Sequence, residues 1–91
     1  MQKAIPILPK HIFWDIDLKD STFKKYPGFV IVRVFERGDI PEIRAIRRYY
    51  GDELIKNEVV RARYIEPETL NFLSAIYNIP QKKFKCYTAA L

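Results

Sequence analysis

Apolar side chains recur at helical spacing through the middle of the chain. Over residues 29–37 they form pairs four positions apart, which predicts a short buried helix. The pairs are Val30 with Val34 and Ile31 with Phe35. The β-branched residues of this run would also suit a strand. We favour the helix because a helix-ending glycine follows and no strong second strand candidate is present to pair with it.

Two Gly-Asp pairs, at 38–39 and 51–52, each combine a helix end with a helix start. A glycine just past a helix supplies a left-handed C-terminal cap, and an aspartate after it accepts hydrogen bonds from the next helix's first N–H groups. Glu42 completes a capping-box pattern at the first corner. The corners therefore predict one helix over about 40–50 and another over about 52–63.

A fourth amphipathic helix is expected to begin near Pro67, because proline suits the first turn of a helix. Its apolar positions are Leu70, Leu73, Ile76 and Tyr77. Asn78 can cap its end, and Pro80 prevents its continuation. Residues 82–87 then close the chain as a basic segment with alternating apolar anchors.

Residues 1–28 predict an irregular N-terminal arm, because prolines and a glycine interrupt them before the first convincing helix. Within this arm, 11–14 fits one helical turn, 15–18 alternates as an extended run would, and 19–22 indicates a turn. The expected fold is all-α, in one domain. It is a compact bundle of about four short helices over 29–91, with the arm packed on the core.

Composition and charge narrow the class of protein. The chain has 91 residues, of which 48% are hydrophobic, enough for one folded core. No apolar run approaches the roughly 20 residues needed to cross a bilayer, so we expect no association with a membrane. The prolines of the arm argue against a secretory signal, so we expect a cytoplasmic location. A lone cysteine, Cys86, fits a reducing compartment. The net charge of +5 is spread thinly along the chain and permits contact with nucleic acid or with an acidic protein.

Candidate catalytic and metal-binding groups are sparse. Asp15 and Asp17 resemble the acidic pairs that hold divalent cations, but the further elements of a nucleotidyl-transfer site are missing, and we interpret them as turn residues. His11 and Cys86 are each alone in their type, and nothing in their spacing pairs them as base and nucleophile. We therefore expect no enzyme activity, no small-molecule substrate, no metal and no cofactor.

Basic residues on the second and third expected helices form the best nucleic-acid candidate. They are Arg44, Arg47, Arg48, Lys56, Arg61 and Arg63. Two helices on a tight turn with outward Arg and Lys are typical of major-groove readers. Interleaved acidic residues argue instead for local pairing of the charges. A helix-turn-helix also usually keeps a small residue four positions before its turn glycine, where this chain has Arg47.

Aromatic residues near both ends of the chain are candidate partner anchors. They are Phe13, Trp14, Phe84 and Tyr87. Packing over the helical core is the simpler interpretation of these rings. If the termini project, large aromatics beside lysine are also what protein-binding anchors look like.

Five blocks along the chain together resemble a known family. The blocks are Leu8-Pro9-Lys10-His11-x-Phe13-Trp14-Asp15-x-Asp17, Val34-Phe35-Glu36-Arg37-Gly38, Tyr49-Tyr50-Gly51, Thr69-Leu70-Asn71-Phe72 and Ile79-Pro80-x-x-x-Phe84-x-Cys86-Tyr87. The chain resembles a small, uncharacterised bacterial family whose genes tend to lie beside nucleotidyltransferase-like toxins of the abortive-infection type. The resemblance implies an antitoxin-like or accessory role beside such a toxin.

Two functions are therefore expected, in order. The first is a non-catalytic protein-binding module, an antitoxin-like partner of a nucleotidyltransferase-like toxin that uses the four aromatic anchors. The alternative is a helix-turn-helix DNA-binding regulator that uses the basic residues. Both can hold in one protein, because antitoxins can also repress their own promoters.

Overall fold

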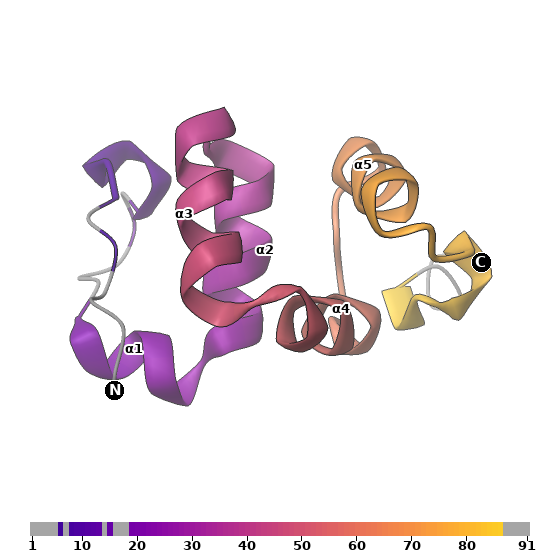
Figure 1. The fold of residues 1–91 in the computed structure, drawn as a ribbon, viewed down its shortest axis with the longest axis horizontal. Coiled ribbons are helices and arrows are strands. Elements are labelled where there is room, and N and C mark those ends of the chain that lie inside the picture. The colour runs from indigo at the N-terminus through magenta and orange to yellow at the C-terminus, as the bar shows by residue number, and fades with distance from the viewer. Residues whose placement is uncertain (1–5, 7, 14, 16–18, 87–91) are drawn as a thin grey trace.

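The fold is all-helical, as expected, in the part of the chain that the computed structural model describes, namely residues 6, 8–13, 15 and 19–86. Five α-helices and two short 3-10 helices follow one another without an intervening strand in these residues (Figure 1). They are η1 (Lys10–Phe13), α1 (Asp20–Lys25), α2 (Pro27–Arg37), α3 (Ile40–Tyr50), α4 (Asp52–Arg61), α5 (Pro67–Tyr77) and η2 (Gln81–Lys83).

Helix α2 is the centre of the arrangement, because it contacts η1, α1, α3 and α4. In Figure 1, α2 and α3 lie side by side, while α4 and α5 are viewed nearly along their axes. The buried face of α2 is formed by Val30, Ile31, Val34 and Phe35. This face confirms the helical interpretation of the β-branched run, because the i, i+4 pairs all point into one core.

The first corner, between α2 and α3, differs in part from its prediction. Gly38 is extended (φ −88°), so the prediction of a left-handed cap there was wrong. A glycine is needed for space instead: a Cβ at Gly38 would lie 2.8 Å from the carbonyl oxygen of Val34 and 3.0 Å from Cβ of Glu42. The Asp39 N–H donates to Glu42 Oε1 at 2.8 Å, which is the glutamate half of the predicted capping box.

The second corner, between α3 and α4, has the predicted positive φ at its glycine. Gly51 has φ +85° and ψ 150°, a backbone region that glycine adopts most readily. We predicted that Asp52 caps the next helix, but it is the first residue of that helix. Its carboxylate accepts hydrogen bonds from Arg47 and Tyr77, described below, because the glycine brings α4 back toward the end of α3.

The C-terminal helix matches its prediction closely. Helix α5 starts at Pro67 and ends at Tyr77, and Asn78 is left-handed (φ 53°), as a capping asparagine should be. The Ser74 hydroxyl donates to the carbonyl oxygen of Ile79 at 2.5 Å and secures this end. Helix α4 stops two residues earlier than expected, at Arg61, because Ala62 is already extended.

The N-terminal arm is more regular than the sequence predicts. Residues 20–25 form α1, although only a turn over 19–22 was expected there, and 10–13 form η1. Phe23 is the buried residue of α1, and the Tyr50 hydroxyl donates to its carbonyl oxygen at 2.7 Å. A helix this short has too few apolar positions to show a 3.6-residue period. It depends instead on contacts with another helix, which the sequence pattern does not show.

The core joins η1 and the five α-helices, whereas η2 has no buried residue. The core contains Ile12, Phe13, Phe23, Val30, Ile31, Val34, Phe35, Ile46, Ile55, Val59, Ile65, Leu70, Leu73, Phe84 and Cys86. None of the helices in the described residues has the length and hydropathy needed to span a membrane.

Candidate functional site

The aromatic residues proposed as partner anchors are placed differently from the prediction. Phe13 is 5% exposed and Phe84 is 1% exposed, so both rings belong to the core in this conformation. Trp14 and Tyr87 lie outside the described residues. Neither of the two predicted anchors that the structure describes has an accessible ring, because both rings fill space between helices.

Two other aromatic residues line an open groove beside α2. Tyr64 is 68% exposed and Phe29 is 39% exposed, and they share a groove of about 590 Å³. One wall is the outer side of α2, and the other is the end of α4 with the extended residues after it. Large exposed apolar rings around one hollow are typical of protein-binding surfaces.

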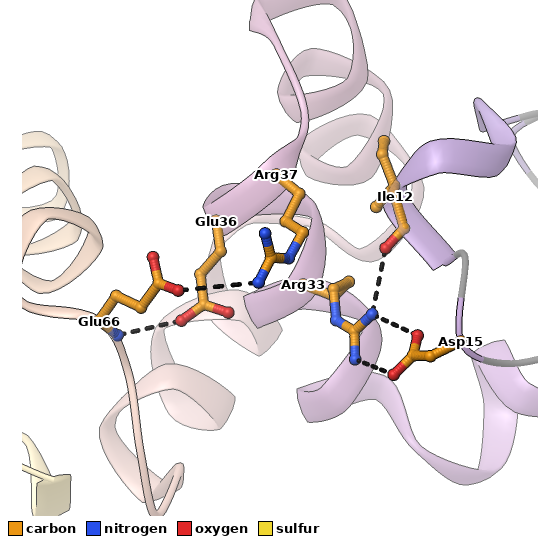
Figure 2. Close-up of polar contacts among 6 residues, drawn as sticks. All are labelled: Ile12, Asp15, Arg33, Glu36, Arg37 and Glu66. Carbon is orange, nitrogen blue, oxygen red and sulfur yellow. Dashed lines mark hydrogen bonds and ion pairs between the residues drawn. The ribbon is translucent and has the colours of Figure 1, made fainter.

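The extended segment after α4 explains why Tyr64 faces outward. Ile65 is 4% exposed and anchors the segment in the core, and its neighbour Tyr64 remains outside. The next residue, Glu66, ties the segment to α2: its N–H donates to Glu36 Oε2 at 3.0 Å (Figure 2). Its carboxylate lies 3.9 Å from the Arg37 guanidinium. The segment that carries Tyr64 is therefore tied to α2 beside the groove.

Arg33 forms a rigid part of the α2 wall. Its guanidinium donates to both carboxylate oxygens of Asp15, at 2.7 and 3.1 Å, and to the carbonyl oxygen of Ile12 at 3.2 Å (Figure 2). It also lies 5.0 Å from the ring centre of Phe29, within cation–π range. The hydrogen bond from Arg33 lowers the pKa of Asp15, so this carboxylate stays ionised. Asp15, considered above as a metal ligand, instead fixes the arm to α2.

Arg61 and Arg63 give the groove its available positive charge. Both are exposed, and neither has an ion-pair partner within residues 19–86 or the described part of the arm. Glu58 also lines the groove, with its carboxylate packed over Gly28, where a Cβ would lie 3.1 Å from Oε2. Two free guanidiniums beside exposed rings are suited to a ligand that combines carboxylates with apolar groups.

The predicted nucleic-acid residues are not all available. Arg47 donates to Asp52 Oδ1 at 3.0 Å, and its guanidinium lies 5.5 Å from the ring centre of Tyr77. Tyr77 donates its hydroxyl to the same Asp52 oxygen at 2.8 Å. Lys56 pairs with Glu53 at 3.1 Å. The residue at the expected helix-crossing position is therefore a clamp that joins the α3–α4 corner to α5.

The pKa values follow from this clamp. Hydrogen bonds from Arg47 and Tyr77 lower the pKa of Asp52 below its ordinary 3.8. Burial, with the bond to Asp52, raises the pKa of Tyr77 to about 12. The first turn of α4 thus presents ionised Asp52 next to Glu53. Negative charge at this position disfavours contact with the phosphate backbone of DNA, which is also negative.

The described residues contain no cluster of metal-binding side chains. No group of three or more His, Cys, Asp or Glu side chains is placed there to hold a metal ion. His11 is exposed on η1, whereas Cys86 is buried.

Sequence reasoning missed Phe29 and Tyr64 as site residues. Phe29 belongs to an almost continuously apolar run, so it was assigned to a buried helix. Tyr64 falls between the helix expected over 52–63 and the one expected from Pro67, so no pattern gave it a role. The exposure of Tyr64 follows from the burial of Ile65, because adjacent side chains in an extended segment point to opposite sides, and the sequence alone does not show that Ile65 is buried.

Comparison with protein families matches residues 8–59 to a family of unknown function (DUF6922). The match spans η1, α1, α2, α3 and most of α4. No curated protein and no solved structure matches the chain.

Proposed function

The chain belongs to a protein family of unknown function (DUF6922), and from its surface we propose that it is a non-catalytic protein-binding module. The observation that carries this proposal is the groove beside α2, where exposed Phe29 and Tyr64 adjoin Arg61 and Arg63. Tyrosine and arginine are the residue types most enriched where binding energy concentrates in protein interfaces. The backbone of the groove is held in α2 and α4 and by the hydrogen bond from the Glu66 N–H, so little backbone ordering remains to oppose binding.

The partner we propose is a nucleotidyltransferase-like toxin, which this chain neutralises or assists. The resemblance described above supports this partner. So does the chemistry of the groove: nucleotidyl transfer relies on carboxylates that hold divalent cations, so such a partner carries an acidic site. Arg61 and Arg63 complement negative charge of this kind.

Co-expression with the protein encoded beside this chain tests the partner. We expect the two proteins to co-purify and the growth defect caused by the neighbour to be relieved. Tyr64→Ala combined with Arg63→Ala should weaken both effects, whereas Tyr26→Ala should not, because Tyr26 is also well exposed (61%) but does not line the groove. Separate purification with unchanged toxicity would reject a toxin partner.

DNA binding is the second candidate, favoured by the tight α3–Gly51–α4 corner and the exposed Arg44. The paired Arg47 and the acidic first turn of α4 weigh against it. A duplex carrying the chain's own promoter provides the test, with affinity measured over a series of salt concentrations. A DNA-binding role requires affinity to fall steeply with salt, and Arg44→Ala should reduce the salt slope by about 1. Salt-insensitive or undetectable binding excludes this role.

A further inference from the structure

A second groove, of about 320 Å³, lies where the end of α2 meets the starts of α3 and α5. Its apolar lining is Phe35, Ile40, Ile43 and Phe72. Ile40 is 57% exposed and Phe72 is 38% exposed, and Phe72 rests against Phe35 with 6.0 Å between ring centres. The groove is thus apolar at its floor and open to solvent at its edge.

Exposure of Ile40 is not required by the local structure. It is the first residue of α3, a position where the helix start is already served by the Asp39 and Glu42 contact. A polar residue at position 40 would leave the backbone hydrogen bonds of the helix start equally well satisfied. An isoleucine more than half exposed beside a second exposed ring marks a surface suited to burial by another molecule.

The charge around this groove is negative, although the whole chain carries +5. Asp39, Glu36 and Glu68 line it. Glu36 accepts the Glu66 N–H, so part of its charge serves the fold. Asp39 and Glu68 have no ion-pair partner among the described residues. Their charge is therefore available to a cationic ligand that also covers the apolar floor.

We propose that this groove binds a helical segment of a partner protein that presents an aliphatic face flanked by Lys or Arg. The aliphatic side chains cover Ile40 and Phe72, and the flanking cations approach Asp39 and Glu68. This is the helix-in-groove mode of recognition, with opposite charges fixing the orientation. The inference is independent of the toxin partner, because it concerns a different groove, whose charged lining residues are all acidic.

Two synthetic amphipathic helical peptides of equal length provide the probe. They share one leucine face, and one carries lysine and the other glutamate beside that face. Fluorescence anisotropy of each labelled peptide is measured against the full chain. The lysine peptide should bind at least about tenfold more tightly than the glutamate peptide. Equal affinity for the two peptides, or binding of neither, overturns the proposal.

Variants locate the binding. Ile40→Asp should weaken the lysine peptide by about tenfold or more, and Glu68→Lys should weaken it while strengthening the glutamate peptide. Leu54→Asp is the matched control, because Leu54 is 39% exposed on α4 and lines neither groove. Circular dichroism confirms that each variant is folded. Equal loss in Leu54→Asp and Ile40→Asp would contradict the assignment to this groove.

Two further measurements separate the alternatives. Tyr64→Ala should leave peptide binding unchanged, so failure of the toxin partner and failure of this inference are distinguishable. Sedimentation of the chain alone should show a monomer. A dimer that Ile40→Asp dissociates would mean that a second copy occupies the groove, which overturns the proposed partner segment.

Discussion

At the scale of single residues, the three glycines occupy their positions for different structural reasons. Gly38 is required because backbone and side-chain atoms of neighbouring turns crowd its missing Cβ. Gly51 is required because of its positive φ, although the space around it is open. The sequence predicted a helix corner at both positions, but the reason at Gly38 depends on a close approach between α2 and α3 that only the fold reveals.

Alanine at either corner should destabilise the protein. Gly38→Ala is expected to lower the free energy of unfolding by about 1–3 kcal/mol through steric overlap. Gly51→Ala should lower it by a similar amount, about 1–3 kcal/mol, through backbone strain. Urea denaturation followed by circular dichroism measures both.

Gly28→Ala is the matched control for these two variants. Gly28 lies in α2, where alanine is the better helix former, and the crowding atom is the mobile end of Glu58. Its effect should be neutral or stabilising by up to about 1 kcal/mol. Equal destabilisation at all three glycines would contradict the assigned causes.

Asp52 should make stability depend on acid pH. Its pKa is lowered in the folded state by Arg47 and Tyr77, so the unfolded chain takes up a proton at higher pH than the folded chain does. The resulting stabilisation is present above pH 3.8, the ordinary value, and is lost as the pH falls through the lower folded pKa. Since the side chain is 49% exposed, the effect should stay below about 1 kcal/mol.

Denaturation of wild type and Asp52→Asn over a pH series measures this contribution. The asparagine variant should be less stable at neutral pH, and the difference between the two proteins should shrink as the pH falls below 3.8. A difference that is constant with pH would show that Asp52 contributes only through its shape or uncharged hydrogen bonds.

At the scale of elements, the sequence predicts the longer helices well. Helices α3 and α5 have clear apolar spacing with proline near the start and glycine or asparagine at the end, so local chemistry indicates their bounds. Helix α2 begins at Pro27, two residues before the expected start, because its proline and glycine were assigned to the arm. Helix α1 was missed because its six residues carry little periodicity and depend on the contacts of Phe23 with Tyr49 and Tyr50. The candidate groove was missed for the same kind of reason: it requires knowing that Ile65 is inside.

Two isoleucines at different places in the helices should differ sharply in their contribution to stability. Ile31 on α2 is fully buried, and Ile31→Ala should lower the free energy of unfolding by about 2–5 kcal/mol by leaving a cavity. Ile40 on α3 is 57% exposed, and Ile40→Ala should change it by no more than about 0.5 kcal/mol. Thermal and chemical denaturation check both. A large loss at Ile40 would show that the second groove has a structural role.

At the scale of the whole molecule, α2 borders two grooves that differ in charge: one is lined by both arginines and glutamates, and all charged residues that line the other are acidic. Glu36 lines both grooves, and its bond to the Glu66 N–H marks the boundary between them. Helices α2, α3 and most of α4 fall within the family match, but Arg61, Arg63 and Tyr64 lie beyond it. The sequence identified the basic residues as candidates for nucleic-acid binding. It did not show which of them pair with acidic residues, because pairing depends on how helices α3, α4 and α5 meet.

The affinity of the purified chain for the protein encoded beside it, which we propose to be its partner, is the most direct test of the protein-binding account. Isothermal titration calorimetry should give a defined complex with wild type and at least about tenfold weaker binding with Tyr64→Ala and Arg63→Ala combined. Tyr26→Ala should bind like wild type. Absence of a complex with wild type, or equal affinity for the groove variant and wild type, would contradict the account.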